Sequence, residues 1–202
     1  MKENHQNHSS EHSTETMTGS GLGKVNVSEE CFLVGFAMGA YGSQRRKYTG
    51  RPYYEHPLEV MYLVSHFNQD EEVLLAAVAH DLIEDRDFDY VLLKEMFGER
   101  VADIVHELTD LPNENLNRAQ RKAIDRKRLA LASHEAQTIK YADLISNTAS
   151  IVEHDPKFAE LYLAEKEALL AVMTGGDQRL RKAALLGLEK AKKDLQRKVS
   201  QQ

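Results

Sequence analysis

Four ionisable side chains stand close together in the stretch AHDLIED at residues 79–85: His80, Asp81, Glu84 and Asp85. The preceding EEVLLAAVA is apolar apart from its two glutamates, which predicts a buried helix at this point. Because a buried charge is costly unless it is paired or coordinates a metal, these side chains need a partner or an ion. If one helix continues to the end of the stretch, His80 stacks on Glu84 and Asp81 on Asp85, which predicts one compact polar patch.

Two further polar residues lie in apolar segments elsewhere, His56 in YYEHPLEV and Asp143 in IKYADLISN. Two imidazoles and two carboxylates from three helices form a mixed nitrogen and oxygen donor set. Such a set suits a divalent ion that keeps free positions for water, such as Mn²⁺ or Mg²⁺, with Fe or Zn possible. A bound ion would also keep Asp81 and Asp143 ionised in a dry interior. The plainer alternative is that His80 and Asp81 only bond to neighbouring residues or lie at an exposed helix end.

The elements that must position these residues are helices. From Ser28 onward apolar residues recur at helical spacing, and no segment shows sustained two-residue alternation. Asp70 is a predicted N-cap, and Pro57 suits a first helical turn. We therefore predict an all-α domain of about eight or nine helices. The expected helical segments are 28–42, 56–67, 70–85, 87–98, 99–110, 117–133, 134–154, 155–173 and 178–199.

Length and composition limit the possible architectures. The chain has 202 residues, which suits one domain, and its 29% charged and 42% hydrophobic residues are ordinary for a soluble globular protein. No run of 18 apolar residues occurs, so no membrane span is expected, and the N-terminus lacks the apolar core of a secretory signal. The single cysteine, Cys31, cannot form an internal disulfide, which favours a cytoplasmic location. The net charge of −6 argues against nucleic-acid binding.

The charge pattern suggests three parts. Residues 1–24 are predicted to form a disordered polar tail, because they hold too few apolar residues to order themselves. Residues 25–174 are expected to form the main domain, and residues 175–202 a basic C-terminal helix. From residue 179 to the end, eight Lys and Arg face two acidic residues, a net charge of +6. We expect this helix to pack on the domain or to serve in association, for example in a homodimer.

Three segments together carry a resemblance to a known family. They are QRRKYTGRPYYEHPLEV, AAVAHDLIEDRDFDYVLLKEMFGERVADIVHELTD and IKYADLISN. The order H…HD…D on helices resembles the HD superfamily of metal-dependent phosphohydrolases. The full motifs are more similar to the hydrolase domain of the RelA/SpoT family, especially its stand-alone small alarmone hydrolases. The likeness runs from about residue 30 to about residue 173. It implies that residues 25–174 form an HD-domain helical bundle.

The resemblance also implies roles for individual residues. It implies metal ligation, with Mn²⁺ as the expected ion, by His56, His80, Asp81 and Asp143. Glu84 and Asp85 match the acidic pair that positions and deprotonates the attacking water. Arg46 and Lys47 match a basic pair that stacks on the base or holds phosphate. Further nucleotide contacts are implied for Asn147 and Ser150, and Tyr162 could reach a phosphate unless it is a core aromatic.

The implied function is hydrolysis of the 3′-pyrophosphate of guanosine tetra- or pentaphosphate, with the guanine nucleotide alarmone as substrate. One alternative is an HD-type nucleotidase acting on a nucleoside monophosphate or NADPH. Another is a non-catalytic nucleotide-binding or antitoxin module, which the intact pair of Glu84 and Asp85 disfavours. The basic run from Arg118 to Arg128 is either a solvated helix face or the rim of an anion-binding pocket.

Overall fold

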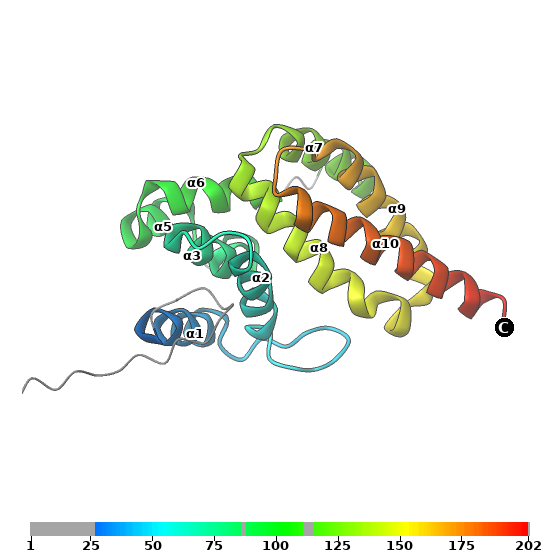
Figure 1. The fold of residues 1–202 in the computed structure, drawn as a ribbon, viewed down its shortest axis with the longest axis horizontal. Helices are drawn as coiled ribbons and strands as arrows, with labels where there is room; N and C mark the ends of the chain where they lie inside the picture. The colour runs from blue at the N-terminus through cyan, green and yellow to red at the C-terminus, as the bar shows by residue number, and fades with distance from the viewer. Residues whose placement is uncertain (1–26, 86–87, 111–114, 202) are drawn as a thin grey trace, which may run out of the picture.

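Helices form the whole framework of the molecule. The structure is a computed structural model, and it describes residues 27–85, 88–110 and 115–201 (Figure 1). These residues contain ten helical segments. They are α1 (Val27–Tyr41), α2 (Glu55–Ser65), α3 (Glu71–Ala79), α4 (Leu82–Asp85), α5 (Tyr90–Phe97), α6 (Glu99–Leu108), α7 (Arg118–Leu131), α8 (His134–His154), α9 (Pro156–Val172) and α10 (Gln178–Val199). Because α4 is a single turn, the all-α prediction of about eight or nine helices is confirmed. The predicted tail at residues 1–24 lies outside the described residues.

Most helix starts are fixed by a polar side chain that accepts a hydrogen bond from the first turn. Asp70 accepts from the backbone N–H of Glu72, as the sequence predicts. Comparable caps begin five more helices, at Asp89, Asn117, Ser133, Asp155 and Asp177. Each cap satisfies an N–H group that has no partner inside its helix.

The long helix α8 lies at the centre of the bundle. It packs against α2 and α6 on one side and against α9 and α10 on the other (Figure 1). Its buried residues include Ile139, Tyr141, Ala142 and Leu144. Asp143 is buried on the part of α8 that faces α2, where its Oδ1 lies 3.3 Å from Nε2 of His56.

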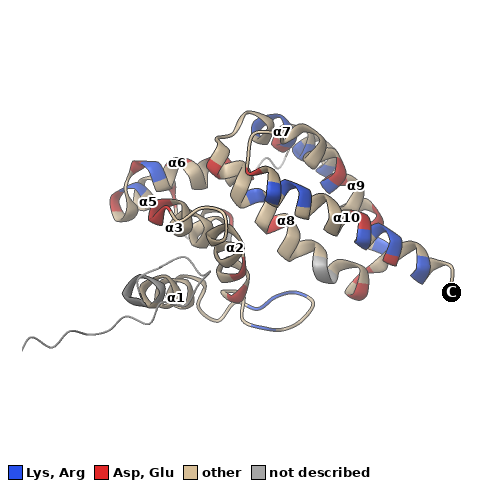
Figure 2. Ribbon diagram, in the orientation of Figure 1, with Lys and Arg blue, Asp and Glu red and all other residues tan. Residues whose placement is uncertain are grey.

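The C-terminal helix α10 is amphipathic, and its apolar side packs on α8 and α9. The buried positions are Leu180, Ala184, Leu188 and Ala191. Lys and Arg gather on α7 and α10 (Figure 2). One of them, Lys198, donates from Nζ to the carbonyl oxygens of Val152 at 3.1 Å and Glu153 at 2.9 Å, at the end of α8. None of the described helices combines the length and the apolar character needed to cross a bilayer.

The predicted single helix over residues 70–85 is wrong. The structure ends α3 at Ala79 and begins α4 at Leu82, so that His80 and Asp81 occupy the turn between them. The carbonyl oxygen of Ala77, which a continuing helix would give to the N–H of Asp81, is contacted by Nδ1 of His80 at 2.8 Å. The histidine and aspartate therefore do not follow the regular stacking that the sequence suggested.

Candidate metal centre and substrate pocket

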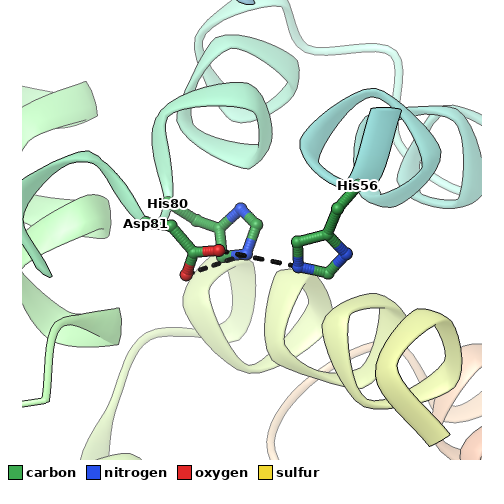
Figure 3. A group of neighbouring side chains, drawn as sticks. All are labelled: His56, His80 and Asp81. Carbon is green, nitrogen blue, oxygen red and sulfur yellow. Dashed lines mark ion pairs between the residues drawn. The ribbon is translucent and has the colours of Figure 1, made fainter. Parts of the chain in front are cut away.

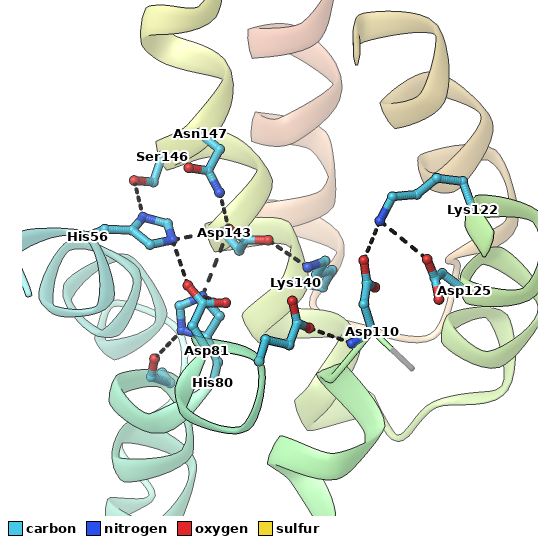
Figure 4. A network of polar contacts seen from close by, with 12 residues as sticks. His56, His80, Asp81, Asp110, Lys122, Asp125, Lys140, Asp143, Ser146 and Asn147 are labelled. Atoms are coloured by element: carbon cyan, nitrogen blue, oxygen red, sulfur yellow. Dashed lines mark hydrogen bonds and ion pairs between the residues drawn. The ribbon is translucent and has the colours of Figure 1, made fainter. Parts of the chain in front are cut away.

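Four side chains meet where the α3–α4 turn faces α2 and α8 (Figures 3 and 4). They are His56, His80, Asp81 and Asp143, and we call them the ion cluster. Nε2 of His56 lies 3.6 Å from Asp81 Oδ2 and 3.3 Å from Asp143 Oδ1. Nε2 of His80 lies 3.2 Å from Asp81 Oδ1 and 3.9 Å from Asp143 Oδ1. The four predicted ligands thus present nitrogen and oxygen atoms to one small volume.

The two imidazoles have the surroundings that a metal ligand needs. Both histidines are only 2% exposed, and neither Nε2 atom has a hydrogen-bond partner among the described residues. Buried polar atoms are rarely left in this condition unless an ion or a water satisfies them. The ligand atoms of His56, His80 and Asp81 lie within 4.8 Å of one another, and Asp143 Oδ1 lies 3.3 Å from Nε2 of His56. This arrangement fits a divalent cation that takes mixed nitrogen and oxygen ligands.

The two carboxylates are held in the ionised form. Burial alone would raise the pKa of Asp81, but His80 and His56 hold it well below its usual value. Tyr53 also donates its hydroxyl hydrogen to Asp81 Oδ2 at 2.6 Å. Burial opposes ionisation of Asp143 as well, but Lys140, whose Nζ lies 2.8 Å from Asp143 Oδ2, together with His56 and His80 holds the pKa of that carboxyl well below its usual value. The cluster therefore offers charged oxygen atoms to a cation.

The ion cluster opens into a pocket of about 400 Å³. The acidic residues that line it include Asp81, Asp143 and Glu84. The described residues around the pocket include six cationic side chains, from Arg46, Lys47, Lys122, Arg126, Lys140 and Lys166. A pocket of this size with fixed charges of both signs suits a small polyanion bound next to a metal ion.

The predicted substrate contacts fall into two groups. Arg46, Lys47, Asn147 and Tyr162 all line the pocket. Arg46 donates from Nη2 to Asn147 Oδ1 at 3.3 Å, and Asn147 donates from Nδ2 to Asp143, so that this predicted contact pair is linked to the ion cluster. The side chain of Ser150, although its position lies on α8, is outside the described residues.

Glu84 and Asp85 are the predicted acidic pair. The structure describes the side chain of Glu84, and that of Asp85 lies outside the described residues. Glu84 is an exposed residue, and its carboxylate lines the pocket and accepts a hydrogen bond from the backbone N–H of Asp110. Loss of hydration in the pocket is the main cause that raises the pKa of Glu84, Lys140 opposes it and the Asp110 carboxylate adds to it, and together they bring the pKa to about 7. A carboxyl group with this pKa can exchange a proton with water near neutral pH.

Several cationic residues at the pocket were not assigned from the sequence. We call Lys122, Arg126 and Lys166, which come from α7 and α9, the basic wall. Lys122 contacts Asp110 Oδ2 and lies 3.3 Å from Asp125 Oδ2 (Figure 4). Burial lowers the pKa of Lys166 to about 8, and Lys140 lowers it as well. The basic run of α7 could be read as a pocket rim, but nothing in the sequence pointed to Lys166.

Comparison with known proteins gives a consistent picture. A family profile described as the HD domain matches residues 34–168. The guanosine-3′,5′-bis(diphosphate) 3′-pyrophosphohydrolase of Aquifex aeolicus is 35% identical over 119 residues, which cover 57% of this chain and 17% of that protein. The guanosine-3′,5′-bis(diphosphate) 3′-pyrophosphohydrolase MESH1 of Danio rerio is 35% identical over 139 residues, which cover 66% of this chain and 76% of that protein.

A solved structure has the same arrangement of helices. It is described as a metazoan ortholog of SpoT that hydrolyzes ppGpp. It superposes with a TM-score of 0.70 at 26% identity, and the match covers 83% of this chain and 96% of that chain. The chain therefore spans nearly all of that relative but only a small part of the Aquifex protein.

Proposed function

The chain belongs to the HD-domain family, and we propose that it hydrolyses the 3′-pyrophosphate of guanosine tetra- or pentaphosphate, releasing GDP or GTP and pyrophosphate. The strongest support is the meeting of two buried histidine Nε2 atoms with two carboxylates next to a pocket that is lined by cationic side chains. The names of the relatives at 35% identity supply the substrate.

The ion cluster is the proposed site of a divalent cation, held by His56, His80, Asp81 and Asp143. We propose Mn²⁺, because the donor set combines imidazole nitrogen with carboxylate oxygen. A cation at this place would supply positive charge to a phosphoryl group and increase the acidity of water near it. The remaining chemistry belongs to the side chains of the chain itself.

Glu84 is the proposed general base. Its carboxylate accepts a proton from the water that attacks the phosphorus atom bonded to the ribose 3′-oxygen. A bond forms from the water oxygen to phosphorus, and the bond from phosphorus to the 3′-oxygen breaks. The 3′-oxygen then takes a proton to become the 3′-hydroxyl of GDP or GTP, and the phosphorus that gained the water oxygen leaves as part of pyrophosphate. A pKa of about 7 places Glu84 where it can accept a proton and return it at neutral pH. Asp85 is the proposed second member of this acidic pair.

The cationic residues are proposed to bind the substrate. Lys122, Arg126 and Lys166 line the same pocket as Asp81 and Asp143, and their positive charge would offset the repulsion between a polyanion and the carboxylates. Arg46 and Lys47 reach the pocket from the loop before α2, where a planar guanidinium can stack on a base or hold a phosphate. Asn147 and Tyr162 are the proposed contacts from α8 and α9, and Ser150 is proposed as a further one.

The direct test is incubation of the protein with Mn²⁺ and a panel of nucleotides. Release of pyrophosphate from guanosine tetraphosphate is the expected result. Release of orthophosphate from a nucleoside monophosphate or NADPH, without action on guanosine tetraphosphate, would favour a nucleotidase instead. Binding without any release would point to a nucleotide-binding module. The same preparation, examined by light scattering, would test the proposed homodimer, and fractionation of cells would test the proposed cytoplasmic location.

A further inference from the structure

The two histidines of the ion cluster are oriented by different kinds of partner. Nδ1 of His80 lies 2.8 Å from the carbonyl oxygen of Ala77, which can only accept, so Nδ1 carries the hydrogen. Nδ1 of His56 lies 2.9 Å from the hydroxyl oxygen of Ser146, which can either accept or donate. The tautomer of His56 therefore depends on the direction of one hydroxyl hydrogen.

Glu59 decides that direction. Ser146 donates from Oγ to Glu59 Oε2 at 2.6 Å, and a serine hydroxyl has one hydrogen to give. Ser146 must then accept from His56, so that Nδ1 of His56 carries a hydrogen and Nε2 keeps its lone pair. That lone pair lies on the side of Asp81 and Asp143, where Nε2 is 3.6 Å and 3.3 Å from their oxygen atoms.

We propose that Glu59 is a positioning residue that acts through Ser146 to hold His56 in the tautomer whose Nε2 faces the metal centre. This role rests on the metal site of the proposed function. Glu59 is not within the ion cluster itself, and two hydrogen bonds through Ser146 connect it to His56. Outer partners of histidine ligands fix the ring and the tautomer, and their loss usually lowers metal affinity by about 10- to 100-fold.

The exposure of Glu59 determines how much metal affinity should be lost when it is replaced. His56 and Ser146 are 2% and 4% exposed, whereas Glu59 is exposed and lines a second pocket of about 320 Å³ behind the ion cluster. Water in that pocket can replace part of the lost acceptor when Glu59 is shortened. Ser146 contacts Nδ1 of His56 directly, so the loss of its hydroxyl should matter more than the loss of Glu59.

The test measures the affinity for Mn²⁺ alone, by competition with a fluorescent chelator and without nucleotide. We expect Ser146→Ala to weaken binding by about 10- to 100-fold and Glu59→Ala by about 10-fold. Glu59→Gln should keep most of the affinity, because its amide oxygen can still accept the hydroxyl hydrogen. In the double variant with Ser146→Ala, replacement of Glu59 should have no further effect, because its only route to His56 is already gone.

Glu55→Ala is the matched control. Glu55 lies one turn earlier on α2, lines the same second pocket, and pairs with Arg51 at 2.7 Å without touching Ser146. Its replacement removes the same charge and should leave the affinity for Mn²⁺ within twofold of the parent. Thermal unfolding of each metal-free variant checks that the fold is retained.

Three results would overturn the role of Glu59. They are unchanged affinity in Glu59→Ala, an equal loss in Glu59→Gln and Glu59→Ala, or an undiminished effect of Glu59 in the Ser146→Ala background. The last two would mean that Glu59 acts by its charge alone. A parent protein that binds no Mn²⁺ would instead overturn the metal site of the proposed function, and the role of Glu59 with it.

Discussion

The ion cluster opens into the same pocket that the basic wall lines, but the two groups are held in different ways. Within the ion cluster, each side chain has a second contact that fixes it, such as the Ala77 carbonyl for His80 and the Tyr53 hydroxyl for Asp81. In the basic wall, Lys122 is engaged by two carboxylates. Lys166 has no ion pair among the described residues and lies 5.0 Å from the centre of the Tyr162 ring.

This difference matches two tasks within one site, the binding of a small cation and the binding of a polyanionic substrate. Atoms that bind a small cation must already be in place, because each displacement weakens coordination. Cations that bind a flexible polyanion need only be near, since they can leave a carboxylate for a phosphate when the substrate arrives. We therefore expect replacements in the ion cluster to abolish activity and replacements in the basic wall to reduce it gradually.

The largest effect is expected from Asp81→Ala. This variant removes one proposed ligand and the carboxylate 3.2 Å from Nε2 of His80. We expect loss of bound Mn²⁺ and a fall in kcat of about 10³-fold or more, because a metal supplies several kcal/mol of charge stabilisation. Metal content by mass spectrometry and steady-state pyrophosphate release check this. Asp103→Ala, on the outer face of α6 where Asp103 accepts a hydrogen bond from Tyr90, is the control and should behave as the parent. Full metal occupancy in Asp81→Ala would contradict the ligand role.

The next effect is expected from Glu84→Gln, at the border between the two regions. The amide has the shape of the acid but cannot accept the proton, so kcat should fall by about 10²-fold while Mn²⁺ affinity is retained. The parent should gain activity as pH rises through about 7, because Glu84 acts as a base only when it is ionised. This limb of the pH profile of kcat/KM should be missing in the variant. A variant as fast as the parent would make Glu84 structural.

A smaller effect is expected from the basic wall. Lys166→Met should raise KM about tenfold and change kcat less, because a charged hydrogen bond to the substrate is lost. Since the pKa of Lys166 is about 8, its positive charge is present below this pH and lost above it. The kcat/KM of the parent should therefore fall on the alkaline side, near pH 8.

Lys166→Arg sharpens this test, because arginine keeps its charge over the whole range. It should move the alkaline fall to higher pH while leaving the limb from Glu84 in place. If both variants at position 166 keep the alkaline limb of the parent, another group causes it. The charge of Lys166 would then have no demonstrated role in substrate binding, and the proposed task of the basic wall would lose its main support.

The smallest effect is expected from Lys198→Met, a cation that belongs to neither region. Its Nζ binds the last carbonyl groups of α8, so the variant should lose about 1 kcal/mol of stability. For a chain of this size, that loss lowers Tm by about 2–4 °C. Scanning calorimetry measures it, and kcat should stay at the parent value. A change in kcat with no change in Tm would place the end of α8 in the catalytic site.

The sequence predicted much of the fold and one side of the site. Caps such as Asp70 and the helical spacing placed the helices with small errors, because these signals are local. The four residues proposed as ligands could be singled out because His and Asp are uncommon in apolar segments. The turn at His80 could not be foreseen, since the contact of its ring with the Ala77 carbonyl has no separate sequence signal. Lys166 was missed because a lysine on an amphipathic helix usually faces solvent.

The central helix α8 has a further consequence for how the chain can change in length. Lys140, Asp143, Ser146 and Asn147 all project from it toward the site, within about two helical turns. A helix advances about 1.5 Å and turns about 100° for each residue, so α8 fixes the spacing and the relative direction of these four side chains. Insertion or deletion of one residue between positions 140 and 147 would rotate some of them away from the others. Length differences among relatives should therefore fall in the connections at either end of α8, and none should fall between Lys140 and Asn147.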